Sequence, residues 1–228
     1  MKIVGPKEII RPFIRKIISE AFEAQELSEF LHKIDFDFTE LNLIAYGGNG
    51  VAFDIGNNKV LKITNHVEEA QTAAWLLEYD FAWIVKIYDV FKVESNDRFP
   101  KISGLRFPYW ADTYFIVEER LDTKGASKEV AELLSVIINN FDIKHYRKLG
   151  ILYYLKQQRI KNYIQKENPE LISIYNEVFD LLYSLEQYYG LKFLDFQSGN
   201  VGRDKNGKLK VFDVYFRGKK AEIRTIKI

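Results

Sequence analysis

Three oxygen-bearing side chains near the end of this sequence have types and spacing that suit metal-assisted chemistry on a phosphate group. Asp195 and Asn200 lie five positions apart, and Asp213 follows thirteen positions later inside an apolar run. A carboxylate buried in such a run is costly unless it meets a cation or a metal ion. Asn200 and Asp213 offer the hard oxygen ligands that magnesium prefers, and Asp195 is placed to orient or deprotonate an acceptor hydroxyl. Hydrogen bonds within turns are the simpler alternative for these residues.

A glycine-rich turn and a lysine in the first half of the chain would supply contacts to the phosphates. The turn, between two predicted strands, consists of Gly47, Gly48, Asn49 and Gly50, followed by Ala52. Glycines let the backbone approach phosphate oxygens and offer N–H donors. Lys62 follows twelve positions after the turn, on the face of its strand opposite Leu61 and Ile63, so that it reaches beneath the turn. An ordinary hairpin turn and a solvated lysine are the alternatives.

Two acids begin the helix that is predicted at residues 68–79. Glu68 or Glu69 would pair with Lys62 and hold its amine in place, and we expect Glu69 to be the partner. For at least one of the two acids, a solvated helix face is the alternative, and Glu78 is a more remote candidate for the partner of Lys62.

The elements that must position these residues change in type along the chain. An amphipathic helix is predicted at residues 7–33, and strands are predicted at 41–46, 51–55, 60–64, 84–93 and 113–117. Helices are predicted at 126–140, 143–166 (with a break near Gly150) and 170–189, before short strands around 209–213 and 221–228. A β-rich front is therefore followed by a helical back, with the change near Glu119. This order predicts an α+β fold of two unequal lobes with a cleft between them.

Composition excludes several other kinds of site. The formal net charge is +1 with both signs mixed along the chain, so no nucleic-acid partner is predicted. The chain has no cysteine, which excludes disulfides and thiolate chemistry and fits a reducing cytoplasm. His32, His66 and His145 lie far apart, without the spacing of metal ligands. No segment is apolar enough to predict a membrane span.

At the positions described above, the sequence resembles the protein-kinase-like superfamily. Residues 47–53 resemble the second half of a kinase glycine-rich loop, and the run that ends in Lys62-Ile63 is similar to the Val-Ala-Ile-Lys strand. Asp195 and Asn200 keep the Asp-x-x-x-x-Asn spacing of the catalytic loop, and Asp213 matches the aspartate of the Asp-Phe-Gly motif. The resemblance extends from about residue 41 to residue 214.

The same resemblance implies where adenine binds. Residues 115–121 look like the last strand and the hinge, which hold adenine through backbone groups. The implied contacts come from the backbone of Glu119, Arg120 and Leu121.

The sequence also departs from ordinary protein kinases. Ala45 replaces the first glycine of the loop, Leu194 replaces the usual arginine before the catalytic aspartate, and Gln197 replaces the usual lysine. The Asp-Phe-Gln-Ser-Gly-Asn string is closer to that of aminoglycoside and choline kinase relatives. Tyr215 stands at the position of the motif glycine, and fifteen residues follow Asp213 without an Ala-Pro-Glu motif. The pattern resembles a minimal, atypical kinase, similar to the RIO family or to short kinase-like proteins of bacteriophages.

These features together lead to a set of expectations. The expected fold is a protein-kinase-like fold that ends soon after the metal-binding aspartate, with an N-terminal helical extension (1–38), a small antiparallel β lobe with one helix (39–119) and a mostly helical lobe (120–228). The expected activity is an atypical Ser/Thr protein kinase that uses ATP and Mg²⁺, in the cytoplasm, or in the host cytoplasm for a phage protein. A kinase of small molecules and a nucleotide-binding pseudokinase that binds a partner protein are the alternatives.

Overall fold

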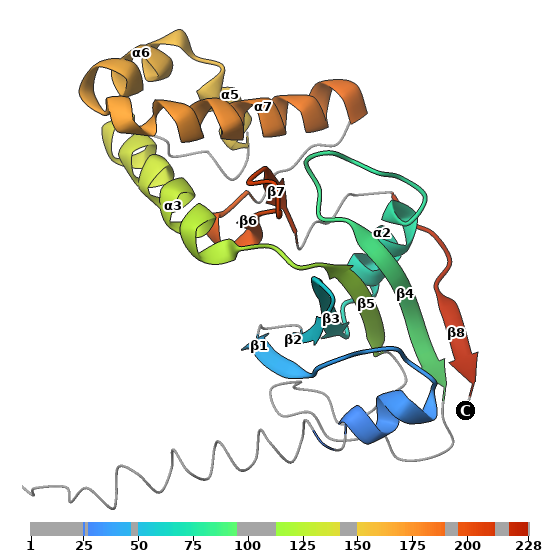
Figure 1. Cartoon of the computed structure of the whole chain (residues 1–228). Helices are drawn as coiled ribbons and strands as arrows, with labels where there is room; N and C mark the ends of the chain where they lie inside the picture. The colour runs from blue at the N-terminus through green and yellow to red at the C-terminus, as the bar shows by residue number, and fades with distance from the viewer. Residues whose placement is uncertain are drawn as a thin grey trace, which may run out of the picture. The chain divides into compact units, whose positions relative to one another are not determined.

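The computed structural model of the chain describes residues 25, 27–46, 50–94, 113–141, 150–189, 196–212 and 219–227. The chain divides into two compact units. The first contains the residues up to Ala70, Tyr88–Glu118 and Ile223–Ile228, and the second contains Gln71–Ile87 and Glu119–Glu222. The first is built on a β-sheet and the second is mainly helical (Figure 1). The expected α+β class, with a β-rich N-terminal region and a helical C-terminal part, is confirmed.

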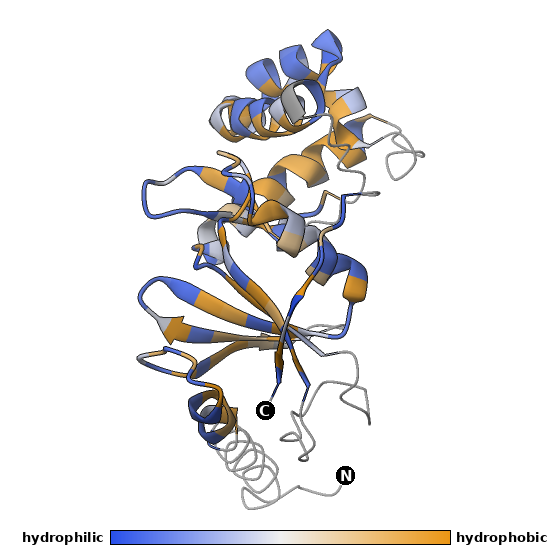
Figure 2. Cartoon of the chain, turned by 90° about the vertical axis from the view of Figure 1, so that its right-hand side faces the viewer, coloured by the Kyte–Doolittle hydropathy of each residue, from blue (hydrophilic) through white to orange (hydrophobic). Residues whose placement is uncertain are grey.

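A six-stranded sheet forms the first unit, with the strand order β1-β2-β3-β5-β4-β8. Its strands are β1 (Asn42–Tyr46), β2 (Gly50–Gly56), β3 (Lys59–Thr64), β4 (Ile87–Glu94), β5 (Tyr114–Glu119) and β8 (Arg224–Lys227). The strands β1, β2 and β3 pair in antiparallel order. Apolar residues alternate with polar ones along several of these strands, as the colouring of Figure 2 shows, and every residue of β5 is buried.

The hairpin between β2 and β3 is closed by a two-residue turn. Asn57 and Asn58 both have positive φ, 52° and 58°, between the paired residues Gly56 and Lys59. This is the geometry of a type I′ turn, whose twist matches that of the flanking strands. The Asp54 carboxylate accepts a hydrogen bond from the Gly56 N–H at 3.0 Å and stabilises the approach to the turn. The hairpin sets the register that brings Lys62 opposite Ala52.

One helix and several loop aromatics complete the core of the first unit. Residues 27–33 are helical, and their buried side chains Leu27, Phe30 and Leu31 pack in the same cluster as the strand residues Phe91 and Phe115. The rings of Phe91 and Phe115 stack with centroids 4.9 Å apart. Burying such rings removes a large apolar area from water, which is the main source of stability of this unit. Of the helix that was predicted at 7–33, residues 7–24 and 26 lie outside the described residues.

One pair of strands in this sheet is parallel, and one of these two strands lies outside residues 39–119, the range of the predicted antiparallel β lobe. The last strand, β8, pairs in parallel with β4, and Phe91 lies opposite Arg224. Two parallel neighbours need a long connection, and here most of the chain lies between the two strands. The first unit therefore includes residues 223–228, which the predicted division at residue 120 assigned to the helical lobe.

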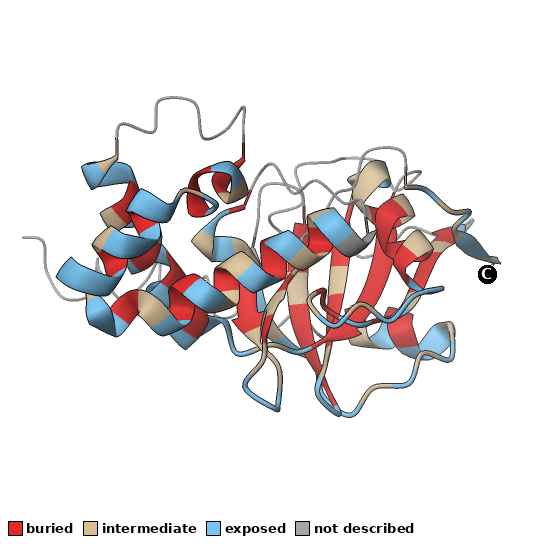
Figure 3. Ribbon diagram, turned by 90° about the horizontal axis from the view of Figure 1, so that it is seen from above, coloured by how far each residue is buried: buried red, intermediate tan, exposed pale blue. Residues whose placement is uncertain are grey.

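Four α-helices of the second unit alternate between buried and exposed residues, as Figure 3 shows. They are α3 (Thr123–Asn140), α5 (Ile151–Leu155), α6 (Gln158–Glu167) and α7 (Ile172–Tyr189), the last preceded by the short 3-10 helix η2 (Pro169–Leu171). Asp122 caps α3, since its carboxylate accepts a hydrogen bond from the Lys124 N–H. Of the helix that was predicted at 143–166, residues 143–149 lie outside the described residues. After Gly150, α5 begins, and a break at residues 156–157 separates α5 from α6.

A short hairpin accompanies these helices. It consists of β6 (Val201–Arg203) and β7 (Leu209–Val211), and it follows the 3-10 turn η3 (Ser198–Asn200). The start of the predicted strand at 84–93 also belongs to this unit, because Ile84 forms a parallel bridge with Val211 while β4 begins only at Ile87. Among the described residues, no helix is long and apolar enough to span a membrane.

Candidate functional site

Lys62 and Glu69 form an ion pair within the first unit. Lys62 lies on β3, and Glu69 lies in the first turn of the next helix, α2 (Val67–Leu76). The Lys62 ammonium contacts the Glu69 Oε1 atom, and each side chain is 14% exposed. A charged pair with so little exposure is screened less by solvent than a surface pair. The expected partner of Lys62, Glu69 rather than Glu68, is therefore the one that the structure brings to it.

The loop between β3 and α2 fixes the second oxygen of Glu69. The Thr64 hydroxyl, which is fully buried, donates a hydrogen bond to Glu69 Oε2 at 3.0 Å. The same hydroxyl accepts a hydrogen bond from the His66 N–H at 3.1 Å. The His66 Nδ1 atom in turn accepts from the Glu69 N–H at 3.3 Å, so the imidazole caps the start of α2. Both carboxylate oxygens of Glu69 are thus engaged by residues of the β3–α2 connection.

Two residues of the predicted phosphate-binding turn are described. Ala52 lies directly opposite Lys62 in the β2–β3 ladder, and residues in this position share one face of the sheet. Gly50 lies opposite Thr64, where an added Cβ would come within 2.5 Å of the Ile63 carbonyl oxygen. Glycine at position 50 therefore serves the close approach of β2 to β3. Gly47, Gly48 and Asn49 lie outside the described residues.

Residues 119–122, which include the predicted adenine-binding segment (119–121), form backbone hydrogen bonds within the second unit at both ends. At its start, the Glu119 N–H donates to the Lys86 carbonyl at 2.8 Å. At its end, Asp122 exchanges two backbone hydrogen bonds with Arg203, each 2.9 Å long. Arg120 and Leu121 lie between these points. The sequence predicts a hinge at this segment, and its contacts with adenine stay a prediction.

A buried lysine joins this segment to β7. The Lys210 amine lies 2.7 Å from the Glu119 carboxylate and 3.5 Å from that of Asp204, and its side chain is 12% exposed. Burial by itself raises the pKa of Asp204, but hydrogen bonds from the Lys208 and Asn206 N–H groups, with the charge of Lys210, lower this pKa below its ordinary value. Asp204 is therefore held ionised beside Lys210.

Of the two predicted magnesium ligands, Asn200 is described, together with the residue that precedes Asp213 in the sequence. The Phe212 N–H donates to the Asn200 carbonyl at 3.1 Å, so the residue immediately before Asp213 lies against Asn200. Asp195 and Asp213 lie outside the described residues. An amide oxygen and a carboxylate are ligands that suit magnesium. Among the described residues, no group of three or more His, Asp or Glu side chains is arranged to hold a metal ion.

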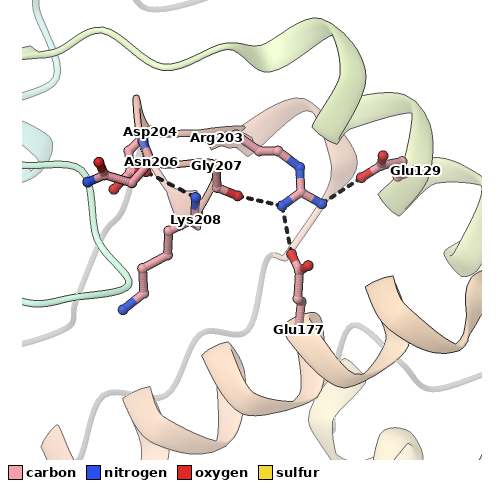
Figure 4. Close-up of polar contacts among 7 residues, drawn as sticks. All are labelled: Glu129, Glu177, Arg203, Asp204, Asn206, Gly207 and Lys208. Atoms are coloured by element: carbon pink, nitrogen blue, oxygen red, sulfur yellow. Dashed lines mark hydrogen bonds and ion pairs between the residues drawn. The ribbon is translucent and has the colours of Figure 1, made fainter.

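The β6–β7 hairpin that follows Asn200 is anchored to two helices. The Arg203 guanidinium donates to Glu129 of α3 at 2.7 Å and to Glu177 of α7 at 2.8 Å, as Figure 4 shows. It also donates to the Gly207 carbonyl at 2.8 Å. Gly202 packs so closely that an added Cβ would lie 2.5 Å from the Leu121 Cβ. The contacts of Arg203 hold β6, which directly follows Asn200, against α3 and α7.

Sequence reasoning missed Thr64, Lys210 and Arg203. A signal for Thr64 was available, since a residue two positions after Lys62 lies on the same strand face and points toward the same helix. Lys210 shows the pattern of Lys62, a lysine between apolar strand residues, but its partners Glu119 and Asp204 are set by the tertiary fold. Arg203 joins residues of three separate elements, and no local pattern predicts such a network.

Of the comparisons with known proteins, only the comparison with solved structures gives matches. No protein-family model matches the chain, and no curated protein matches it either. Among solved structures, 264 chains match. One of these is a MAP kinase from Leishmania major, with a TM-score of 0.46 and 13% sequence identity over 87% of this chain. The match covers 52% of the kinase, so this chain spans about half of its length.

Proposed function

We propose that this chain is a phosphotransferase that binds ATP together with magnesium and transfers the γ-phosphoryl group to a hydroxyl. The observation that carries the proposal is the ion pair of Lys62 with Glu69, between the third strand and the following helix. In protein kinases, a lysine on this strand pairs with a glutamate of the next helix and binds phosphates of ATP. The proposal is supported by the retained spacing of Asp195, Asn200 and Asp213 in the sequence.

Each of the predicted site residues has a separate role in the proposed reaction. Lys62 places its positive charge on the phosphates, and Glu69 holds the lysine in the orientation that this requires. The backbone of residues 119–121 binds adenine. Asp195 accepts the hydrogen bond of the acceptor hydroxyl and orients its oxygen toward phosphorus, which reduces the entropy cost of the transition state. No covalent intermediate with the protein is needed, because positioning and charge stabilisation supply most of the rate enhancement in this chemistry.

Magnesium would be held by the side chains of Asn200 and Asp213. When bound, the ion neutralises negative charge on the phosphate oxygens. The backbone contact of Phe212 with Asn200 supports this assignment, because Phe212 directly precedes Asp213 in the sequence. The burial of Val201 and Val211 beside them holds this part of the backbone in place.

We propose a protein Ser or Thr hydroxyl as the acceptor, in an atypical kinase of the minimal type to which the sequence bears a resemblance. The test is incubation of the chain with γ-labelled ATP and Mg²⁺, alone and with a cell lysate. We expect label on protein, with at least a hundredfold loss in Asp195→Ala and Asp213→Ala, a size on the order of one lost positioning or charge-stabilising group. Asp180→Ala, which changes an exposed carboxylate of α7, is the matched control and should transfer label at the wild-type rate.

Three outcomes would replace this proposal. Label that appears only on small molecules of the lysate would identify a metabolite or antibiotic kinase. Binding of ATP without transfer to any acceptor would identify a nucleotide-binding pseudokinase. Transfer that persists unchanged in both aspartate variants would show that the activity belongs to a contaminant.

A further inference from the structure

We infer that Thr64 is a positioning residue, which holds the Glu69 carboxylate in the orientation that fixes Lys62. The inference rests on the proposed function for its consequence in catalysis, and on the contacts of the first unit for the positioning itself. Thr64 acts through Glu69 and makes no contact with a substrate in this account.

The geometry assigns one function to each oxygen of Glu69. Oε1 contacts the Lys62 ammonium, and Oε2 accepts the hydrogen bond of the Thr64 hydroxyl at 3.0 Å. A carboxylate bound at one oxygen only is free to rotate about its last side-chain bond. The second hydrogen bond removes this freedom, so the oxygen that faces Lys62 stays in place.

The Thr64 hydroxyl is itself held in a single orientation. It accepts a hydrogen bond from the His66 N–H at 3.1 Å, which leaves its proton directed at Glu69. The side chain is fully buried, and Gly50 lies opposite it in the ladder, where no Cβ occupies the space. A buried hydroxyl with both a donor and an acceptor partner is a rigid link between the end of β3 and the start of α2.

Because Lys62 and Thr64 are two positions apart on one strand, they face α2 from the same side. The three residues therefore form one network in which strand and helix are joined twice, by an ion pair and by a hydrogen bond. Loss of the hydroxyl should free Glu69 and loosen Lys62 without changing the volume of the core.

The test compares Thr64→Val, which keeps the volume and removes the hydroxyl, with Thr64→Ser, which keeps the hydroxyl. The matched control is Thr72→Val, because Thr72 is also fully buried and its hydroxyl donates to the Lys219 carbonyl instead. The probe is N-hydroxysuccinimide acetate, and the readout is the rate of Lys62 acetylation by mass spectrometry in the absence of nucleotide. Acetylation of Lys59, on the same strand, serves as the internal reference.

We expect acetylation of Lys62 to be about threefold faster in Thr64→Val, because an amine outside its ion pair reacts faster. A rate change of this size corresponds to a charge-assisted hydrogen bond that is replaced in part by hydrogen bonds to water. Thr64→Ser, Thr72→Val and the Lys59 reference should keep the wild-type rate. A wild-type rate at Lys62 in folded Thr64→Val would overturn the inference. If Thr64→Val shows no cooperative thermal unfolding, Thr64→Cys is measured in its place, because its thiol has a similar size and is a weak donor.

The consequence for catalysis is tested with labelled ATP and Mg²⁺. Thr64→Val should lower kcat about tenfold, Thr64→Ser should restore it, and Thr64→Val should have no further effect in a Glu69→Gln background. An equal additional loss in that background would show that Thr64 acts on stability alone. If the wild-type chain neither binds nor uses ATP, the proposed function fails, and the acetylation rates still decide whether Thr64 positions the pair.

Discussion

At the scale of single residues, one largely buried lysine in each unit is held by acidic side chains in the same way. Lys62 pairs with Glu69 in the first unit, and Lys210 pairs with Glu119 and Asp204 in the second. In both units the lysine lies on a short strand, and its side chain is largely buried. A buried ammonium needs such partners, because burial without them disfavours the charged form strongly.

Asp204 should make stability depend on pH in the acid range. Its pKa is lower in the folded chain than its ordinary value of 3.8, so its ionised form stabilises the fold above that value. As the pH falls through the lower folded pKa, this contribution is lost. Asp204→Asn should therefore lower stability at pH 7 by about 1–2 kcal/mol and make the fall in Tm below about pH 4 less steep. Thermal unfolding of both proteins across the acid range measures this, and parallel curves would contradict it.

Tyr175 should make the stability of the fold depend on pH in the alkaline range. Its hydroxyl donates to the Leu155 carbonyl at 2.5 Å, and burial raises its pKa to about 12 from 10.0. The neutral form is favoured in the fold, so this contribution is complete below pH 10 and is lost as the pH rises toward 12. Tyr175→Phe should cost about 1 kcal/mol at pH 7 and remove part of the alkaline loss of stability. Denaturant titrations at neutral and alkaline pH test the change, and an equal alkaline loss in both proteins would count against it.

At the scale of elements, the close packing of β6 against the segment after β5 depends on a glycine. A Cβ on Gly202 would lie 2.5 Å from the Leu121 Cβ, so Gly202→Ala must displace either β6 or the segment that contains Leu121. We expect a loss of about 1–3 kcal/mol. Gly125→Ala is the matched control, since nothing lies within 4 Å of a Cβ there and alanine favours the helix α3 by about 0.5–1 kcal/mol. Urea unfolding of the two variants should show changes of opposite sign.

The elements also show how much the sequence alone could predict. The hairpin of β2 and β3 and the helix that carries Glu69 follow from local signals, namely the Asn-Asn turn, the strand alternation and the acids in the first helical turn. The pairing of Lys62 with Glu69 was predictable because both lie within eight residues of one another. The contact of Lys210 with Glu119 was not, since 91 positions separate the two and only the tertiary fold joins them.

The position of β8 shows the same limit at the edge of the sheet. Its residues suggested a strand, but nothing local indicated that it would join β4 in parallel after the whole helical unit. For the candidate site, the spacing of Asp195, Asn200 and Asp213 predicted a common role. Of these three residues the structure describes only Asn200, so the roles of the two aspartates stay predictions.

At the scale of the whole molecule, the chain returns at its end to the sheet with which it began. Ile226 of β8 packs against the core of the first unit, and Arg224 pairs with Asp89 at 2.5 Å. Removal of residues 223–228 would leave the edge of β4 unpaired and uncover part of this core. We expect a loss on the order of 2 kcal/mol and a greater tendency to aggregate. Thermal unfolding and light scattering measure the two effects, and an unchanged Tm would show that β8 contributes nothing.

The central claim is that Lys62 binds the phosphates of ATP in the presence of magnesium, and calorimetric titration of the folded chain with Mg·ATP tests it directly. We expect one nucleotide per chain, with affinity about tenfold weaker in Lys62→Met, because a charged contact to the phosphates is lost. Lys59→Met is the matched control, since Lys59 lies on the same strand over the Tyr88 ring, and it should bind as the wild type does. Binding that Lys62→Met leaves unchanged, or no heat of binding at millimolar Mg·ATP, would contradict the account.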